Sequence, residues 1–183
     1  MTSDHGFTIL DDEVLHRWYA FTLLRRTVCS PRGVVHERSF VDSPGAVGVV
    51  ALTREGDVVL VEQYRPAVDA TLLEIPAGMR DVPGEDPLVT AQRELLEEAG
   101  LTADTWSYLG ATIGSAAVTN SRTEVFLATD LHPGRREPHG PEEEEMIVHR
   151  IPLGTALTLV ESGEIVDAKT SVGLMLAARR RGL

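Results

Sequence analysis

One short segment, DPLVTAQRELLEEAG at 86–100, constrains this chain more than any other. Asp86 is a favourable N-cap, Pro87 suits the first helical position, and Gly100 is a favourable C-terminal stop. Apolar residues recur between them at helical spacing, at Leu88, Ala91, Leu95 and Ala99. The spacing predicts a helix over about 87–99 that packs one apolar stripe against a core.

The same helix carries acidic residues where its own physics disfavours them. Glu94, Glu97 and Glu98 fall in the last two turns, close to the negative end of the helix dipole. Glu94 and Glu98 are also four residues apart, so their like charges repel. Carboxylate oxygens on one helix face are suitable ligands for Mg²⁺ or Mn²⁺. A bound divalent cation, shared by Glu94 and Glu98, would offset the repulsion among the three acids and their unfavourable position on the helix dipole.

Composition places the chain among ordinary globular proteins, with 183 residues, 43% hydrophobic and 25% charged. We expect no membrane span, because apolar runs are too short, and no signal peptide, because a basic start with an apolar core is missing. The single cysteine, Cys29, rules out an internal disulfide framework and, with the other two features, predicts a cytoplasmic protein. The net charge of −11 argues against binding to nucleic acid or an anionic membrane.

Strand and helix patterns alternate along the rest of the chain. Two strands, at 16–28 and 34–41, are expected on either side of a turn at 30–33, and a hairpin joins 46–52 to 57–64. Further strands are expected at 71–75, 105–113, 123–131 and 145–153. Helices are expected at about 154–162 and over 167–182. The mixture favours an α/β fold with a mixed sheet packed between helices.

The segment from Gly78 to Leu101 resembles the Nudix box, whose pattern is Gly, five residues, Glu, seven residues, then Arg-Glu-aliphatic-X-Glu-Glu-X-Gly-aliphatic. Glu85 is followed by seven residues and then by RELLEEAGL at 93–101. One departure is visible, because six residues rather than five separate Gly78 from Glu85. The extra residue lies in the loop before the helix, where insertion costs little.

The resemblance assigns roles to the residues of the box. It implies that Glu94 and Glu98 bind the metal together with the backbone carbonyl of Ala77, and that Glu97 holds a metal-bound water or a second ion. It also implies an ion pair between Glu85 and Arg93 that fixes the loop to the helix, with Gly78 as a structural glycine. A metal held in this way binds a pyrophosphate and activates a water for in-line attack.

Outside the box, the chain resembles the ADP-ribose pyrophosphatase branch of the family. The matching motifs are QYR at 63–65, EIPAG at 74–78, and GEI at 163–165 followed by DAKT at 167–170. The resemblance implies a Nudix α/β/α sandwich at 44–183 and an N-terminal antiparallel β extension at 1–43 that exchanges between the subunits of a homodimer. It implies cleavage of ADP-ribose to AMP and ribose 5-phosphate.

The branch also suggests residues that contact the substrate. Arg65 is implied as a substrate contact, with a surface ion pair as the simpler alternative. Arg38 matches an arginine that reaches the partner's site, and Met79 matches a methionine that lines the site or only packs. The acidic run at 142–145 matches a loop that supplies a general base or late metal ligand, which the match places at Glu142 or Glu144. A solvated loop is the alternative reading of that run.

One loop departs from the pattern of the branch, and this departure leaves more than one class of substrate to consider. The branch often shows S-P-G-x-S-D-E where this chain reads GSAAVTNSRT at 114–123. A nucleotide-sugar or other dinucleotide hydrolase is therefore an alternative. A non-catalytic nucleotide sensor is a lower alternative, because the box is intact. A structural calcium-binding module is lower still, because the sequence lacks an EF-hand loop.

Overall fold

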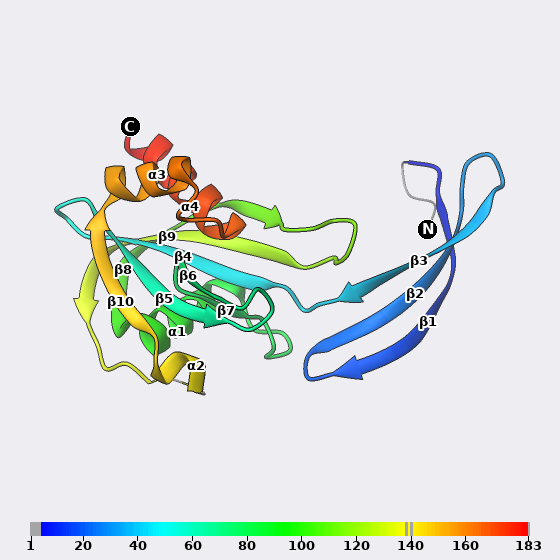
Figure 1. The fold of residues 1–183 in the computed structure, drawn as a ribbon, viewed down its shortest axis with the longest axis horizontal. Coiled ribbons are helices and arrows are strands. Elements are labelled where there is room, and N and C mark those ends of the chain that lie inside the picture. Colours follow the sequence, from blue (N-terminus) through cyan, green and yellow to red (C-terminus); the bar gives the residue numbers. More distant parts are fainter. Residues whose placement is uncertain (1–4, 138, 140, 183) are drawn as a thin grey trace. The chain divides into compact units, whose positions relative to one another are not determined.

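The computed structural model describes residues 5–137, 139 and 141–182, and these form two compact units (Figure 1). The first unit holds the residues up to Gly45 together with Ile113–Arg122. The second holds Ala46–Thr112 and the residues from Thr123 onward. The sequence placed a division at residue 43, and it assigned the 114–123 loop to the larger part.

The first unit is a three-stranded antiparallel sheet in the order β1-β2-β3. Its strands are β1 (Thr8–Trp18), β2 (Phe21–Cys29) and β3 (Val35–Asp42). The prediction of one continuous strand at 16–28 is wrong, because a turn at Tyr19 and Ala20 separates β1 from β2. Tyr19 has a φ of 46°, in the left-handed region that few residues other than glycine adopt. The expected turn at 30–33 is confirmed, and Gly33 has a φ of 78° there.

The loop at 113–122 is held against the end of β3 by hydrogen bonds. The Val41 amide donates to the Val118 carbonyl at 2.8 Å, and the Thr119 hydroxyl donates to the Val41 carbonyl at 2.8 Å. The Asn120 side chain accepts from the Ser43 amide at 2.9 Å. These bonds use small polar side chains at 119 and 120, so the departure in this loop has a structural role within the first unit.

The second unit is built on a seven-stranded sheet in the order β10-β5-β4-β9-β8, with β6 paired to β5 and β7 to β4. The strands are β4 (Ala46–Leu52), β5 (Asp57–Arg65), β6 (Ala70–Glu74), β7 (Ala77–Met79), β8 (Leu101–Ile113), β9 (Arg122–Pro133) and β10 (Ile147–Pro152). The pairing of β4 with β9 is parallel and that of β4 with β5 is antiparallel, so the sheet is mixed as predicted. β7 was not predicted, since three residues give too short a pattern.

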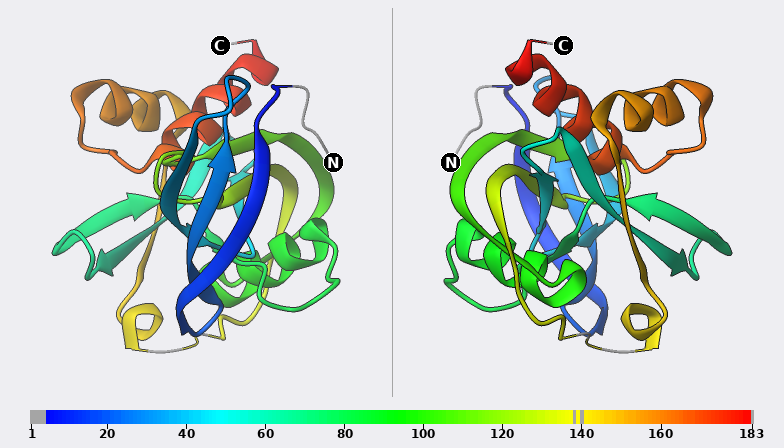
Figure 2. Two further views of the ribbon diagram at one scale, coloured as in Figure 1. Left: turned by 90° about the vertical axis from the view of Figure 1, so that its right-hand side faces the viewer. Right: turned by 90° about the vertical axis from the view of Figure 1, so that its left-hand side faces the viewer.

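Helices cover both faces of this sheet: α1 (Pro87–Ala99) on one face, and α3 (Leu153–Ser162) and α4 (Ala168–Arg181) on the other (Figure 2). The alternation of β4 explains the two layers, because Val47 and Val49 belong to the core cluster with α1, whereas Val50 and Leu52 belong to the cluster with α3 and α4. None of the described helices is long and apolar enough to span a membrane. The predicted α/β/α arrangement is confirmed.

The caps of α1 are those that the sequence predicts. The Asp86 carboxylate accepts from the Leu88 amide at 2.8 Å, and Pro87 begins the helix. Gly100 closes it in the left-handed region at a φ of 64°, with its amide bonded to the Leu96 carbonyl at 2.9 Å. The last turn contains no basic residue, so the C-terminal end of the helix supplies no counter-charge to the acids there.

Candidate active site

The candidate site lies where α1 packs against β7. Glu94 and Glu98 are 7% and 3% exposed, on the helix face turned toward the core. The Ala77 amide of β7 donates to Glu98 Oε2 at 2.8 Å. A Cβ added at Gly78 would lie 2.0 Å from the Glu94 carboxylate carbon, so any side chain there would displace this carboxylate. The box glycine and the two acids therefore form one packed cluster.

Burial changes the acid–base properties of Glu98 most strongly. The pKa of Glu98 is raised to about 8, mainly by burial; the Ala77 amide bond lowers it, the charges of Glu94 and Glu143 raise it, and Arg65 lowers it. A buried carboxylate with one neutral donor is favoured in its protonated form. Without an added cation, this carboxyl is mainly neutral at pH 7.

Glu94 shows the same behaviour to a smaller degree. Burial raises its pKa to about 7, and the charges of Glu97 and Glu143 act in the same direction. Arg93 opposes the rise through an ion pair of 2.8 Å between Nη1 and Glu94 Oε1. This ion pair does not offset the effect of burial on the Glu94 pKa. The cluster therefore contains more acidic groups than the protein's own cations can balance.

Arg93 links the loop before α1 to its acidic face. Its guanidinium lies 2.9 Å from Glu97 Oε2 and 3.6 Å from Glu85 Oε2. Glu85 in turn accepts from the Thr90 hydroxyl at 2.7 Å. The one-residue insertion in the preceding loop therefore leaves the contact between Glu85 and the helix in place.

The acidic run near residue 143 forms a short helix, α2 (Pro141–Glu144), rather than a loop. Its backbone is tied by Arg136, which donates to the carbonyl of Glu143 and, at 3.0 Å, to that of Met146. The side chain of Glu143 accepts from the His139 amide at 2.6 Å. Of the side chains of the run that the structure describes, Glu143 is the one whose charge raises the pKa of both Glu94 and Glu98.

The two residues expected from this run are placed differently. Glu144 is exposed, and the side chain of Glu142 lies outside the described residues. The resemblance placed the base at Glu142 or Glu144 in a loop, whereas in a helical turn residues two apart do not share a face. The sequence did not single out Glu143, because four identical acids in a row do not indicate which of them points to a given side of a helix.

The three substrate contacts expected from the sequence lie in different settings. Arg65 ends β5, and its Nε and Nη2 donate to the two oxygens of Glu74 at 2.8 and 2.7 Å. Met79 ends β7, half-buried, in register with Ala46. Arg38 belongs to β3 of the first unit, and its guanidinium donates to the Glu37 carbonyl at 2.7 Å. Arg65 is therefore an ion-paired residue, and its pKa is raised mainly by the bond with Glu74, with a smaller contribution from the charge of Glu98.

The donor set of the cluster suits a hard divalent cation. The described residues contain no ready-made group of three or more acidic, histidine or cysteine side chains around one point. Glu94 and Glu98 nonetheless combine buried carboxylate oxygens with raised pKa values and a glycine-lined strand against them. Oxygen donors without nitrogen or sulfur are those that magnesium and manganese prefer. The residues present therefore fit such a metal.

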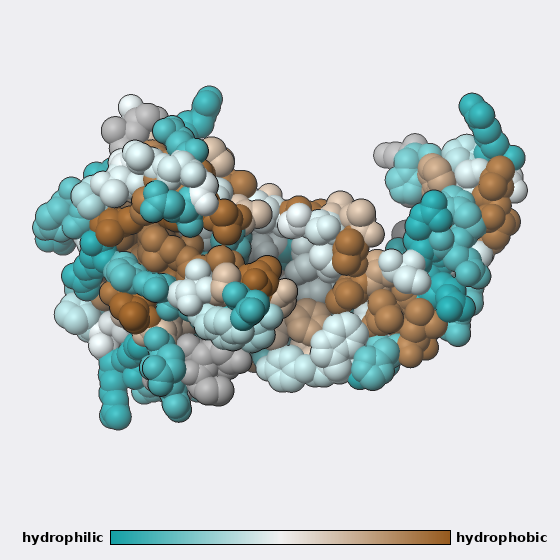
Figure 3. Space-filling view, in the orientation of Figure 1, coloured by the Kyte–Doolittle hydropathy of each residue, from teal (hydrophilic) through white to brown (hydrophobic). Residues whose placement is uncertain are grey.

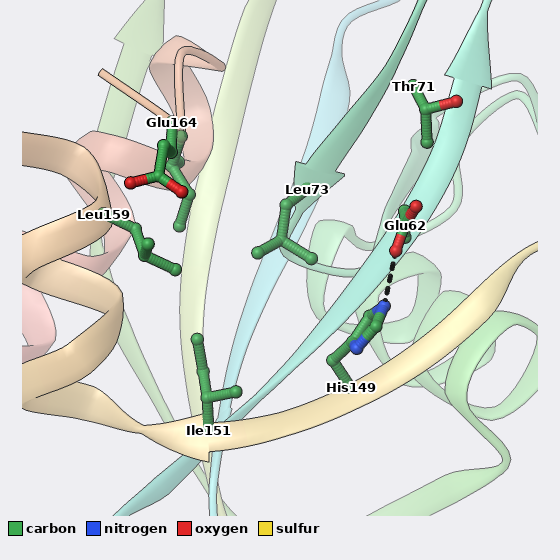
Figure 4. A pocket seen from close by; sticks show the side chains of 8 residues that line it. Glu62, Thr71, Leu73, His149, Ile151, Leu159 and Glu164 are labelled. Carbon is green, nitrogen blue, oxygen red and sulfur yellow. Dashed lines mark hydrogen bonds and ion pairs between the residues drawn. The ribbon is translucent and has the colours of Figure 1, made fainter. Parts of the chain in front are cut away.

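A separate hollow of about 360 Å³ lies on the α3 side of the sheet. Its walls are largely apolar, from Leu73, Ile151, Leu159 and Ile165, and apolar surface is visible over this region in Figure 3. The polar side chains around it include His149 and Glu62, whose nitrogen and oxygen lie 2.7 Å apart (Figure 4). None of the candidate site residues lines this hollow, which therefore does not belong to the acid cluster.

Comparison with known proteins agrees with the geometry. The model of the NUDIX domain family matches residues 42–177. An ADP-ribose pyrophosphatase from Mycobacterium tuberculosis is 38% identical over 94% of this chain and 84% of its own length. One from Bacillus subtilis is 38% identical over 84% of this chain and 82% of its own. A crystal structure of an ADP compounds hydrolase superposes with a TM-score of 0.81 at 25% identity, covering 96% of each chain. The chain therefore belongs to the NUDIX domain family and is a Nudix hydrolase.

Proposed function

We propose that the protein is a magnesium- or manganese-dependent pyrophosphatase that cleaves ADP-ribose to AMP and ribose 5-phosphate. The observation that carries the proposal is the pair of buried glutamates, Glu94 and Glu98, packed against Gly78 without enough protein cations to keep both ionised. The names of the relatives described above support ADP-ribose as the substrate.

Each residue of the site has a part in this proposal. Glu94, Glu98 and the Ala77 carbonyl would hold the divalent cation, which when bound would neutralise pyrophosphate charge and make a water more acidic. Glu97 orients that water from the same helix face. Arg93 and Glu85 keep the face in register with the loop before it. Arg65 presents a cation to the anionic substrate from the end of β5.

Glu143 is our addition to the candidates for the general base. Its charge influences both Glu94 and Glu98, and its backbone is held by Arg136. A general base must be within hydrogen-bond reach of the attacking water, and that water belongs beside the metal ligands. Glu142 and Glu144 stay in the proposal, as the sequence placed them, until the three are compared.

A substrate panel tests the proposal. Purified protein is given ADP-ribose, a nucleotide sugar, NADH and a nucleoside triphosphate, each with Mg²⁺, with Mn²⁺ or with a chelator. We expect ADP-ribose to be cleaved fastest, equimolar AMP and ribose 5-phosphate, and no turnover with the chelator. Faster cleavage of a nucleotide sugar would replace the substrate and keep the reaction. Tight ADP-ribose binding without turnover would identify a sensor instead.

We also propose a homodimer in which the first unit completes the partner's site. Support comes from β1, which is exposed along its whole length and carries Ile9, Leu10, Val14 and Trp18 at 42–54% exposure. Exposed apolar strands are covered by a partner in most native proteins. A two-fold dimer is the commonest assembly that covers such a surface, and it would bring Arg38 to the partner's Arg65.

Mixing two inactive variants tests this arrangement. Glu98→Gln and Arg38→Ala each damage every site of a homodimer. In a mixed dimer, one site combines the intact Glu98 of one chain with the intact Arg38 of the other, so activity returns on mixing under subunit exchange. If each site were contained in a single chain, mixing would restore nothing. Light scattering of the parent gives the dimer mass independently.

The cytoplasm is the proposed location of this activity. The single cysteine, half-buried Cys29, is consistent with a reducing compartment. Fractionation of the source cells tests this location. We expect the protein in the cytoplasmic fraction, and its recovery from an exported fraction would contradict the proposal.

A further inference from the structure

The end of β5 and the start of α4 are joined through one buried carboxylate, Glu74. Arg65 holds both oxygens of Glu74 in a bidentate pair. Lys169, in the first turn of α4, donates a further hydrogen bond to Glu74 Oε2. The Glu74 side chain is 2% exposed and that of Lys169 is 16% exposed. Three charged groups from β5, β6 and α4 therefore meet at one buried carboxylate, with Arg65 partly open to solvent.

Lys169 is distinctive in this sequence. The chain contains 17 basic residues, of which 16 are arginine, and Lys169 is the single lysine. A lysine ammonium is a compact charge with rotatable donors, whereas a guanidinium is a planar fork that needs more room. The position beside Glu74 and Asp167, 3.1 Å from Lys169 Nζ, uses the compact cation.

The first turn of α4 is itself anchored to the strand that enters the acid cluster. Asp167 caps α4 by accepting from the Thr170 amide at 2.9 Å and from its hydroxyl at 2.6 Å. The Thr170 hydroxyl in turn accepts from the Ile75 amide at 2.9 Å. The position of Lys169 is therefore fixed relative to Glu74 by bonds made on both sides of it.

The consequence falls on Arg65. The guanidinium is planar, and its paired edge follows the plane of the Glu74 carboxylate. For its Nη1, the structure gives no hydrogen-bond partner among the described residues, and the side chain is 38% exposed. Fixing Glu74 from α4 thus fixes the direction of the unpaired edge of Arg65, which is the edge left for a ligand.

We infer that Lys169 is a positioning residue that acts through Glu74 to hold Arg65 for an anionic phosphate group of the substrate. The inference deepens the proposed function and rests on it for the identity of the substrate. Removing Lys169 leaves the acid cluster and Arg65 present but frees the Glu74 carboxylate to rotate. The loss should therefore appear in substrate binding more than in the chemical step.

Steady-state kinetics of Lys169→Met test the inference. We expect KM for ADP-ribose to rise about tenfold, the scale of one charge-assisted hydrogen bond, with kcat within about threefold of the parent. Lys169→Arg retains the positive charge but not the compact shape, so its KM should lie between those of the parent and Lys169→Met. Arg179→Met is the matched control, because it removes an exposed positive charge from the other end of the same helix.

A double-mutant cycle separates this role from general support of the fold. If Lys169 acts through Arg65, then Lys169→Met has no further effect on KM in an Arg65→Ala background. Equal effects in both backgrounds would overturn the inference, as would a fall in kcat with KM unchanged. Thermal melts of each variant identify any that fails to fold, and Lys169→Gln, which also removes the charge, replaces Lys169→Met in the cycle if that variant does not fold.

A readout without substrate keeps the inference distinct from the proposed function. Labelling with [¹⁵Nζ]lysine gives a single side-chain ammonium signal, because the chain has one lysine. We expect this signal to be protected from solvent exchange in the parent and to lose protection in Glu74→Gln. ADP-ribose could prove not to be cleaved while the Lys169 signal is still protected and the double-mutant cycle holds with whichever substrate is cleaved. In that case only the proposed substrate is wrong, and the positioning role of Lys169 stands. An unprotected signal in the parent would refute the positioning role.

Discussion

Two buried glutamates in the second unit, Glu74 and Glu98, have almost the same burial and opposite chemistry. They are 1% and 3% exposed. Burial pushes the pKa of Glu74 upward, but the bonds from Arg65 and the charge of Lys169 outweigh it, so the pKa is lowered. Burial also raises the pKa of Glu98, where one amide bond and a more distant Arg65 are insufficient, and the pKa reaches about 8.

The difference shows which buried acid is structural and which is kept for a ligand. Glu74 has its counter-charges built into the chain, so its network is complete without any added group. Among the described residues, Glu98 has no ion pair of this kind, and Glu94 has only its pair with Arg93, so a divalent cation would supply the missing positive charge. Glutamate thus forms a structural ion pair at position 74 and is a candidate metal ligand at position 98.

The largest effect is expected from Glu98→Gln, which breaks the ligand side of the comparison. Glutamine keeps the shape and can still accept from the Ala77 amide, but it does not provide a charged oxygen ligand. We expect kcat/KM to fall at least about a thousandfold, equivalent to about 4 kcal/mol. Assays at saturating Mg²⁺ measure the loss, and activity equal to that of the parent would show that Glu98 is no ligand.

Glu74→Gln breaks the structural side. Removing this carboxylate leaves Arg65 and Lys169 without their counter-charge in a buried setting, so we expect the folded state to lose about 3 kcal/mol. Urea unfolding of the metal-free protein measures the change. Glu98→Gln should act in the opposite direction in that assay, because it removes a buried acid that ionises more readily in the unfolded chain than in the folded protein. Destabilisation by both variants alike would contradict the contrast.

The two acids also predict opposite responses of stability to pH. Glu94 and Glu98 retain protons in the folded state above the ordinary glutamate pKa of 4.5, where the unfolded chain has released them. The metal-free protein should therefore lose about 1 to 3 kcal/mol as pH rises from about 5 to about 8. Glu74, with its lowered pKa, contributes stability that is present above 4.5 and is lost as pH falls through its folded value.

Unfolding curves in chelator across this pH range check the sign. The decline with rising pH should be smaller in Glu98→Gln and should shrink in the parent when Mg²⁺ is added, because the cation replaces the protons. A parent whose stability rises steadily from about pH 5 to about pH 8 would show that these acids ionise freely in the fold.

The smallest expected effect concerns the acidic run. Among Glu142→Gln, Glu143→Gln and Glu144→Gln, we expect Glu143→Gln to lower kcat most, by about tenfold or more, because its charge acts on Glu94 and Glu98. Glu145→Gln, which alters an exposed residue of the same run, is the control. A larger loss from residue 142 or 144 would favour the assignment implied by the resemblance.

Local signals made much of the fold predictable. The caps at Asp86 and Gly100 bound α1 in the sequence as they do in the structure, and alternating valines marked β4 and β5. β1 was missed because its acidic stretch lacks an apolar alternation and its strand is exposed on both sides. The turn at Tyr19 was missed because a left-handed tyrosine carries no turn signal.

The site was predictable where its chemistry is contiguous. Glu94, Glu97 and Glu98 follow one another on a helix, so their pattern is visible in the sequence. The contact of Lys169 with Glu74 spans 95 residues, and no local pattern reports a pairing at that separation. The choice of Glu143 depends on the phase of a four-residue helix, which a run of identical acids does not encode.

Binding of Mn²⁺ in the absence of substrate tests the central claim most directly, namely that the acids of α1 are held for a divalent cation. Titration followed by electron paramagnetic resonance gives free and bound Mn²⁺ for the parent, Glu98→Gln and Glu145→Gln. The account predicts saturable binding by the parent and by Glu145→Gln, and affinity at least about tenfold weaker in Glu98→Gln. Equal affinity in all three proteins would contradict it.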